Sequence, residues 1–271
     1  MDTFVRTGQR AFSITEWSNE DSSLIAGFST KLSGASEGCF GSLNLGYHVE
    51  DKENHVRANR ELLAGEISLP LSTWVGAEQT HGDRVVKVMT ADKGKGAKSY
   101  DTAIKDTDGM YTFESGVLLT LAFADCVPIY FYAPNHHLVG IVHAGWKGTV
   151  KQIAATLVRE WNSLGVKSEE IQAVIGPSIC QSCYIVDDFV RSRIDKIVTN
   201  IGEKYYTEKE QGQYLLNLKE VNLSILQQAG LLRENIYTSS LCTSCDSSTF
   251  FSHRRDQGNT GRMLGFIGWK E

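Results

Sequence analysis

Residues 116–161 read GVLLTLAFADCVPIYFYAPNHHLVGIVHAGWKGTVKQIAATLVREW, and this stretch decides the fold. It contains three runs dense in β-branched and aromatic residues, Val117–Ala124, Ile129–Tyr132 and Leu138–Val142, which predict strands. From Val150 to Trp161 the apolar residues recur at helical spacing on one face, which predicts an amphipathic helix. The stretch therefore predicts buried strands that are covered by a helix.

The flanking sequence repeats both patterns without a regular alternation of strand and helix. The further predicted elements are strands at Val85–Val88, Ala173–Ile175 and Met263–Ile267, and helices over 190–198 and 218–229. Such intermixing favours a single layered α/β (α+β) domain over residues 1–271, with mixed β-sheets flanked by helices. The stretch Thr90–Tyr100, which mixes lysines with glycines and alanines, is expected to be an exposed loop.

Composition excludes several classes of protein. The chain has 271 residues, of which 41% are hydrophobic, and this is enough for a large core. Its formal net charge is -5 and no basic stripe is present, so we expect no nucleic-acid partner. No signal peptide is recognisable and the longest apolar run is strand-sized, so we expect a cytoplasmic protein without a membrane partner. Its six cysteines are then expected to be thiols or ligands rather than disulfides.

Reactive side chains lie in three turns at the ends of predicted strands. The turns are Gln79–Asp83, Ala124–Pro128 and His143–Gly148, which contribute His81, Cys126 and His143. One thiol and two imidazoles are a plausible ligand set for zinc or copper. Three protein ligands leave one coordination position open, which is typical of a catalytic rather than a structural metal. Each residue alone is a weak signal, because single histidines and cysteines at strand ends are usually structural.

Five motifs occur in a characteristic order along the chain: QTHGDRVV, TDGMYT, ADCVPIYFYAP, GIVHAGWKGTV and CTSCDSSTFFSHRRDQGNTGRM. They resemble the YfiH/YlmD family, long labelled a polyphenol-oxidase or laccase domain, and the resemblance extends from about Phe28 to Trp269. It implies a fold like that of the cytotoxic necrotizing factor deamidase toxins. It also implies that His81, Cys126 and His143 bind one catalytic metal ion, with zinc expected and copper an alternative.

The same resemblance implies a reaction. Members of the family are described as phosphorolysing adenosine, inosine and methylthioadenosine to the free base and (methylthio)ribose 1-phosphate, and as deaminating adenosine. A purine nucleoside and phosphate are therefore the expected partners. A homodimer is compatible with the sequence.

Phosphorolysis needs an anion pocket, and the sequence offers several candidate residues. Arg254 and Arg255 are adjacent, so in an extended segment only one faces the site, while the other is available to pair with an acid such as Asp256. The other candidates for binding substrate are Arg60 and Asn44. Asp125 adjoins Cys126 and is a candidate to orient a metal ligand, although it fits equally well as a turn residue that accepts backbone N–H groups.

Three rival interpretations remain open. A multicopper cluster would need His-x-His pairs, and no two of the seven histidines are two positions apart, so the oxidase alternative is reduced to a phenol oxidase side activity that depends on a single copper ion. A cysteine hydrolase would use Cys126 as the nucleophile and a histidine as the base. A structural zinc module would use two CxxC pairs, Cys180/Cys183 and Cys242/Cys245, but their separation far exceeds that of a compact zinc ribbon. We therefore expect these two pairs to be structural cysteines without a metal.

Overall fold

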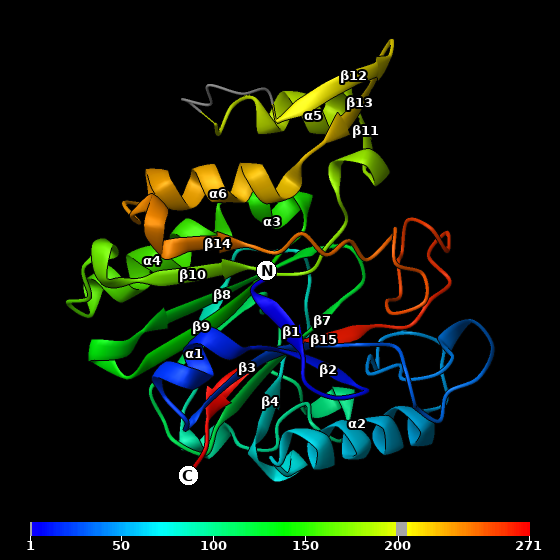
Figure 1. Ribbon diagram of the computed structural model, residues 1–271, viewed down its shortest axis with the longest axis vertical. Coiled ribbons are helices and arrows are strands. Elements are labelled where there is room, and N and C mark those ends of the chain that lie inside the picture. Colours follow the sequence, from blue (N-terminus) through cyan, green and yellow to red (C-terminus); the bar gives the residue numbers. More distant parts are fainter. Residues whose placement is uncertain (1, 199–204) are drawn as a thin grey trace.

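The stretch 116–161 forms the middle of the molecule in the computed structural model, which describes residues 2–198 and 205–271 (Figure 1). Its three predicted strands are confirmed as β7 (Leu118–Phe123), β8 (Val127–Ala133) and β9 (Leu138–Ala144). β8 and β9 form an antiparallel hairpin, whereas β7 belongs to a different sheet. The short turn between β7 and β8 therefore connects two sheets.

Two mixed six-stranded sheets build the core. The first sheet has the order β1 (Phe4–Arg6), β2 (Ala11–Ile14), β3 (Leu24–Ser29), β15 (Met263–Trp269), β7 and β4 (Trp74–Gly76). The second has the order β14 (Ile236–Thr238), β10 (Gln172–Ile175), β8, β9, β6 (Gly109–Thr112) and β5 (Val85–Lys87). Each sheet combines antiparallel pairs with parallel ones at its edge, which confirms the predicted α+β class with mixed sheets.

The residues of β8 alternate between the two faces of the second sheet. Tyr130 and Tyr132 pack between the two sheets, whereas Ile129 and Phe131 pack against the helices on the other side. Those helices are α4 (Ile153–Ser163) and α6 (Leu218–Gln228), while α2 (Glu53–Ile67) covers the outer face of the first sheet. The result is a stack of helix, sheet, sheet and helices, which Figure 1 shows from α2 up to α6.

A small third sheet lies beyond α6 (Figure 1). It consists of β11 (Ile185–Asp187), β13 (Gln213–Leu216) and β12 (Tyr206–Glu210), all antiparallel. The helix α5 (Asp188–Ile194) follows β11 directly, and its first turn is capped by the Asp187 side chain. One further short helix, α1 (Thr15–Glu20), lies between β2 and β3.

Two predicted helix boundaries and one predicted exposed loop were wrong. The helix expected from Val150 onward is divided into α3 (Trp146–Val150) and α4, because Gln152 adopts a left-handed backbone conformation with φ 59°. The helix expected over 190–198 ends at Ile194. The Thr90–Tyr100 stretch is not a wholly exposed loop, since its Ala97 is fully buried and Arg60 donates hydrogen bonds to its backbone.

Candidate active site

His81 lies in the loop that follows β4, and one buried carboxylate determines the shape of this loop. The backbone N–H groups of Thr80, His81 and Gly82 all donate to Asp108, at 3.0, 3.1 and 2.7 Å. His81 itself has a positive φ of 59°, a conformation that costs free energy in a non-glycine residue. The three hydrogen bonds to Asp108 offset that cost and hold the imidazole in place.

Cys126 and His143 are neighbours because of the β8–β9 hairpin. In its register Val127 pairs with Ala144 and Pro128 with His143, so Cys126 lies next to the end of β9. Asp125 precedes it with φ 83°, which turns the chain sharply as it leaves the first sheet. The hairpin thus places the thiol and the imidazole side by side on a rigid scaffold.

The predicted ligands converge. One ligand atom from each of His81, Cys126 and His143 lies within 4.8 Å of the others. Nδ1 of His143 is 2.8 Å from Oδ1 of Asp108, which leaves Nε2 available for a metal ion. This carboxylate–histidine pair is the usual arrangement behind a metal-bound imidazole, and the donor set of one thiol and two imidazoles fits zinc or copper.

The charges within this group reinforce one another. Burial opposes ionisation of the Cys126 thiol, but the neighbouring His143 and His81 outweigh burial and lower the pKa of the thiol below its ordinary value. Burial likewise opposes a charged His143, yet Cys126 and Asp108 raise its pKa. Burial would also raise the pKa of Asp108, but His143 and the loop amides lower it to about 2. The site therefore favours a thiolate, which is the form of cysteine that binds metals.

Gly145 leaves room for this group. A Cβ at this position would lie 2.8 Å from Sγ of Cys126 and 3.3 Å from Cδ2 of His81. Two of the three ligands therefore pack against the space that only glycine leaves open, where the chain passes from β9 into α3.

We expect Gly145→Ala to lower the metal content of the purified protein well below that of the wild type, because the added methyl group displaces the thiol. Metal analysis of the folded variant checks this. Gly65→Ala in α2 is the matched control, since a Cβ there meets nothing within 4 Å and the change should stabilise the helix by about 0.5–1 kcal/mol. An undiminished metal content in Gly145→Ala would contradict the proposed geometry.

The three ligands open into a pocket of about 800 Å³, a size that is typical of small-molecule sites. Arg254, Arg262 and Lys147 bring positive charge to its lining, while Ile179 and Tyr184 contribute apolar surface. An anionic group and a flat apolar ring could both find complementary surface in this pocket.

Asn44 and Arg60 do not reach this pocket. Asn44 is fully buried, and its side chain bonds to Asp51, Gly46 and the backbone of Arg262. The guanidinium of Arg60 donates to the backbone carbonyls of Leu45, Gly96 and Ala97. Both residues hold loops together, so their predicted role in binding substrate does not fit their position.

The structure separates the roles of the two adjacent arginines. Arg254 lines the pocket, and one of its Nη atoms donates to the carbonyl of Ile185 at 2.6 Å. Arg255 instead pairs with Asp256 at 2.8 Å and donates to the carbonyls of Thr243, Ser244 and Phe250. Arg255 is thus the arginine that pairs with Asp256, as expected for one of the two, and its alternative role as a substrate contact does not fit its position.

Of the two roles predicted for Asp125, the structure supports that of a hydrogen-bond acceptor and not that of a residue that orients a metal ligand. Its carboxylate accepts hydrogen bonds from Thr243 Oγ1, Ser252 Oγ and the backbone N–H of Arg254. It therefore anchors the segment that carries Arg254, and Asp108 is the residue that orients a ligand histidine.

Three pocket or supporting residues were missed by the sequence reasoning. Asp108 lies in the TDGMYT motif and Arg262 in TGRM, so both were inside segments that already stood out. His48 also lines the pocket, and burial, followed by the nearby Arg262, lowers its pKa to about 4. A neutral imidazole at this position can accept or donate a hydrogen bond without adding charge.

Within residues 2–198 and 205–271, no helix combines the length and the apolar character that crossing a membrane requires.

The chain is similar to known proteins in both sequence and structure. A family model described as "Multi-copper polyphenol oxidoreductase laccase" matches residues 25–270. Purine nucleoside phosphorylase YlmD of Bacillus subtilis is 48% identical over 99% of this chain and 98% of its own length. The crystal structure of YlmD from Geobacillus stearothermophilus superposes with a TM-score of 0.97, at 44% identity and with both chains fully covered. The crystal structure of the Bacillus licheniformis hypothetical protein YfiH superposes with a TM-score of 0.96, at 48% identity and with both chains fully covered.

Proposed function

Because the chain belongs to the laccase-like YfiH/YlmD family, we propose that it is a metal-dependent purine nucleoside phosphorylase that also deaminates adenosine. One observation carries the proposal: a Cys–His–His ligand set and three cationic side chains face the same pocket. The relatives named purine nucleoside phosphorylase support the reaction class. Adenosine, inosine and methylthioadenosine are the proposed substrates.

The chemistry of the pocket suits phosphorolysis. In this reaction a phosphate oxygen bonds to C1′ of the ribose as the bond from C1′ to the base nitrogen breaks, and the departing base takes up a proton. Arg254 attracts the phosphate through charge-assisted hydrogen bonds, with Arg262 and Lys147 adding to the positive field. The apolar surface of Ile179 and Tyr184 packs against the base and excludes water from it.

His81, Cys126 and His143 would hold the metal ion. When bound there, zinc supplies a Lewis acid at neutral pH, which deamination of a purine requires. Asp108 keeps the His143 imidazole oriented by its hydrogen bond to Nδ1. Copper fits the same donors, but one thiol and two imidazoles do not make a multicopper cluster.

We expect zinc-loaded protein to release adenine from adenosine only when phosphate is present, together with ribose 1-phosphate. Inosine should form with or without phosphate, because deamination consumes only water. Incubation with a panel of nucleosides and mass analysis of the products measures both reactions. If ribose were formed instead of ribose 1-phosphate, the enzyme would be a nucleoside hydrolase and the phosphate pocket would not exist.

A cysteine hydrolase is the second candidate, because Asp108, His143 and Cys126 also form a chain of carboxylate, imidazole and activated thiol. The two candidates respond differently to a chelator. A hydrolase would stay active without metal and would be inactivated by alkylation of Cys126. The proposed phosphorylase would lose activity in the chelator and regain it when zinc is added.

A further inference from the structure

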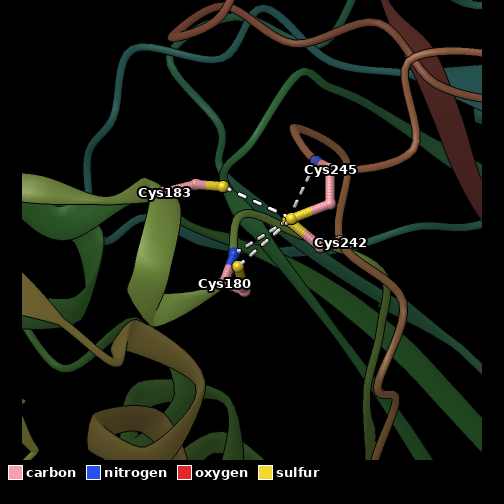
Figure 2. A group of neighbouring side chains, drawn as sticks. All are labelled: Cys180, Cys183, Cys242 and Cys245. Atoms are coloured by element: carbon pink, nitrogen blue, oxygen red, sulfur yellow. Dashed lines mark hydrogen bonds between the residues drawn. The ribbon is translucent and has the colours of Figure 1, made fainter.

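The two CxxC pairs, which we expected to be structural cysteines without a metal, meet in space. Beyond the parallel β10–β14 pair, a parallel bridge between Ser178 and Cys242 lays the two segments side by side. It is closed by a 3.2 Å hydrogen bond from the Thr243 N–H to the Ser178 carbonyl. The ligand atoms of Cys180, Cys183, Cys242 and Cys245 all lie within 4.8 Å of one another (Figure 2).

The sulfur positions match those of a tetrahedral metal site. Sγ of Cys245 is 3.4 Å from Sγ of Cys183 and 3.7 Å from Sγ of Cys180. Four thiolates at about 2.3 Å from a zinc ion would be separated by about 3.8 Å. All four cysteines are free thiols, and Figure 2 shows their side chains directed toward a common centre.

Backbone N–H groups support the same assignment. The N–H of Cys180 points at Sγ of Cys242 at 3.2 Å, and the N–H of Cys245 points at the same sulfur at 3.4 Å. Such donors orient thiolate ligands and stabilise their negative charge. A neutral thiol, which is a weak acceptor, would gain little from two of them.

A buried cation lies beside the cluster. The ammonium of Lys219 donates to the carbonyls of Ser239 and Leu241, directly before Cys242. Burial lowers the pKa of Lys219 to about 8, and the nearby Asp2 carboxylate acts in the opposite direction. A buried ammonium is costly without a counter-charge. Four thiolates around a divalent ion carry a net charge of about −2, and this negative charge would act as the counter-charge of the Lys219 ammonium.

We propose that Cys180, Cys183, Cys242 and Cys245 bind one zinc ion in a closed structural site. Four protein ligands leave no coordination position for water or substrate, so this site does not perform chemistry. It is separate from the His81, Cys126 and His143 group, and the inference does not depend on the proposed function.

The zinc site would fasten one wall of the catalytic pocket. Cys183 is followed directly by the pocket residue Tyr184, and Arg254 donates to the neighbouring carbonyl of Ile185. On the other side of the cluster, Thr243 donates to Asp125 beside Cys126. The ion thus adds a cross-link between two chain segments that are also joined by the β10–β14 pair and the Ser178–Cys242 bridge.

The decisive experiment is zinc analysis of protein purified under reducing conditions in zinc-supplemented buffer. We expect about two zinc ions per chain in the wild type and about one in both Cys126→Ser and Cys183→Ser/Cys245→Ser. Cys39→Ser is the matched control, because this exposed cysteine belongs to neither group, and it should keep both ions. If Cys183→Ser/Cys245→Ser kept the wild-type zinc content, the proposal would be wrong.

A second measurement covers the case in which the double variant does not fold. Cobalt(II) is exchanged into Cys126→Ser, which retains only the four-cysteine cluster as a thiolate site. We expect the strong thiolate-to-cobalt charge-transfer absorption of a tetrathiolate site. Its absence, or a disulfide between any two of the four cysteines in the reduced preparation, overturns the proposal. If the wild-type protein held both zinc ions but did not catalyse phosphorolysis, only the proposed function would be wrong.

Discussion

Replacing His143 with alanine is expected to remove the metal ion from the pocket and to abolish both phosphorolysis and deamination. The imidazole is almost fully buried between Cys126 and Asp108, and alanine offers no ligand atom in its place. Removing even an outer-shell partner of a metal ligand typically costs 10–100-fold in affinity or activity. Loss of a ligand itself should therefore reduce both rates by at least about 100-fold.

The measurement is zinc content together with both rates, and circular dichroism checks that the variant is folded. His136→Ala is the matched control, because His136 lies at the opposite end of the β8–β9 hairpin, paired with Glu170. This control should retain zinc and both activities. Full zinc content at the pocket site in His143→Ala would show that the assigned ligand set is wrong.

Arg254→Ala is expected to reduce phosphorolysis selectively. A charge-assisted contact to phosphate typically contributes about 1.5–3 kcal/mol. Loss of this contact should lower the rate of phosphorolysis roughly ten- to a hundred-fold at a fixed phosphate concentration. Deamination needs only water and should change little. Arg254→Lys keeps the charge without the planar fork, so we expect it to recover part of the lost rate.

The matched comparison is the neighbouring residue. Arg255→Ala removes hydrogen bonds to three backbone carbonyls and the ion pair with Asp256, so it should destabilise the protein by roughly 2–4 kcal/mol. At temperatures where it stays folded, the ratio of the two reactions should equal that of the wild type. If Arg254→Ala lowered both reactions equally, phosphate would bind elsewhere, with Arg262 and Lys147 the remaining cationic residues of the pocket.

The central strands and helix α6 could be predicted because their signals are local. Apolar runs and helical spacing fix β7, β8 and β9 within a few residues, and Gly230 marks the end of α6. The division between α3 and α4 could not be predicted in this way. It depends on a single positive φ at Gln152, a residue type with no preference for that conformation.

The ligands of the candidate site could be proposed because each lies in a short distinctive turn, but their supporting residues could not. Asp108 acts on His143 across 35 positions of sequence, and no local pattern links them. Conversely, a buried arginine that binds carbonyls, such as Arg60, cannot be distinguished in sequence from one that binds phosphate. The meeting of the two CxxC pairs depends on the Ser178–Cys242 bridge, which only the tertiary fold reveals.

The place of β15 in the first sheet has a consequence for biosynthesis. This strand lies between β3 and β7 and pairs with both, yet it comes long after them in the chain. While the nascent chain is being made, β3 and β7 each keep one open, apolar edge until residues 263–269 leave the ribosome. A ribosome stalled before Met263 would therefore display a chain in which β3 and β7 each have an unpaired edge, and such edges are sites of aggregation and chaperone binding.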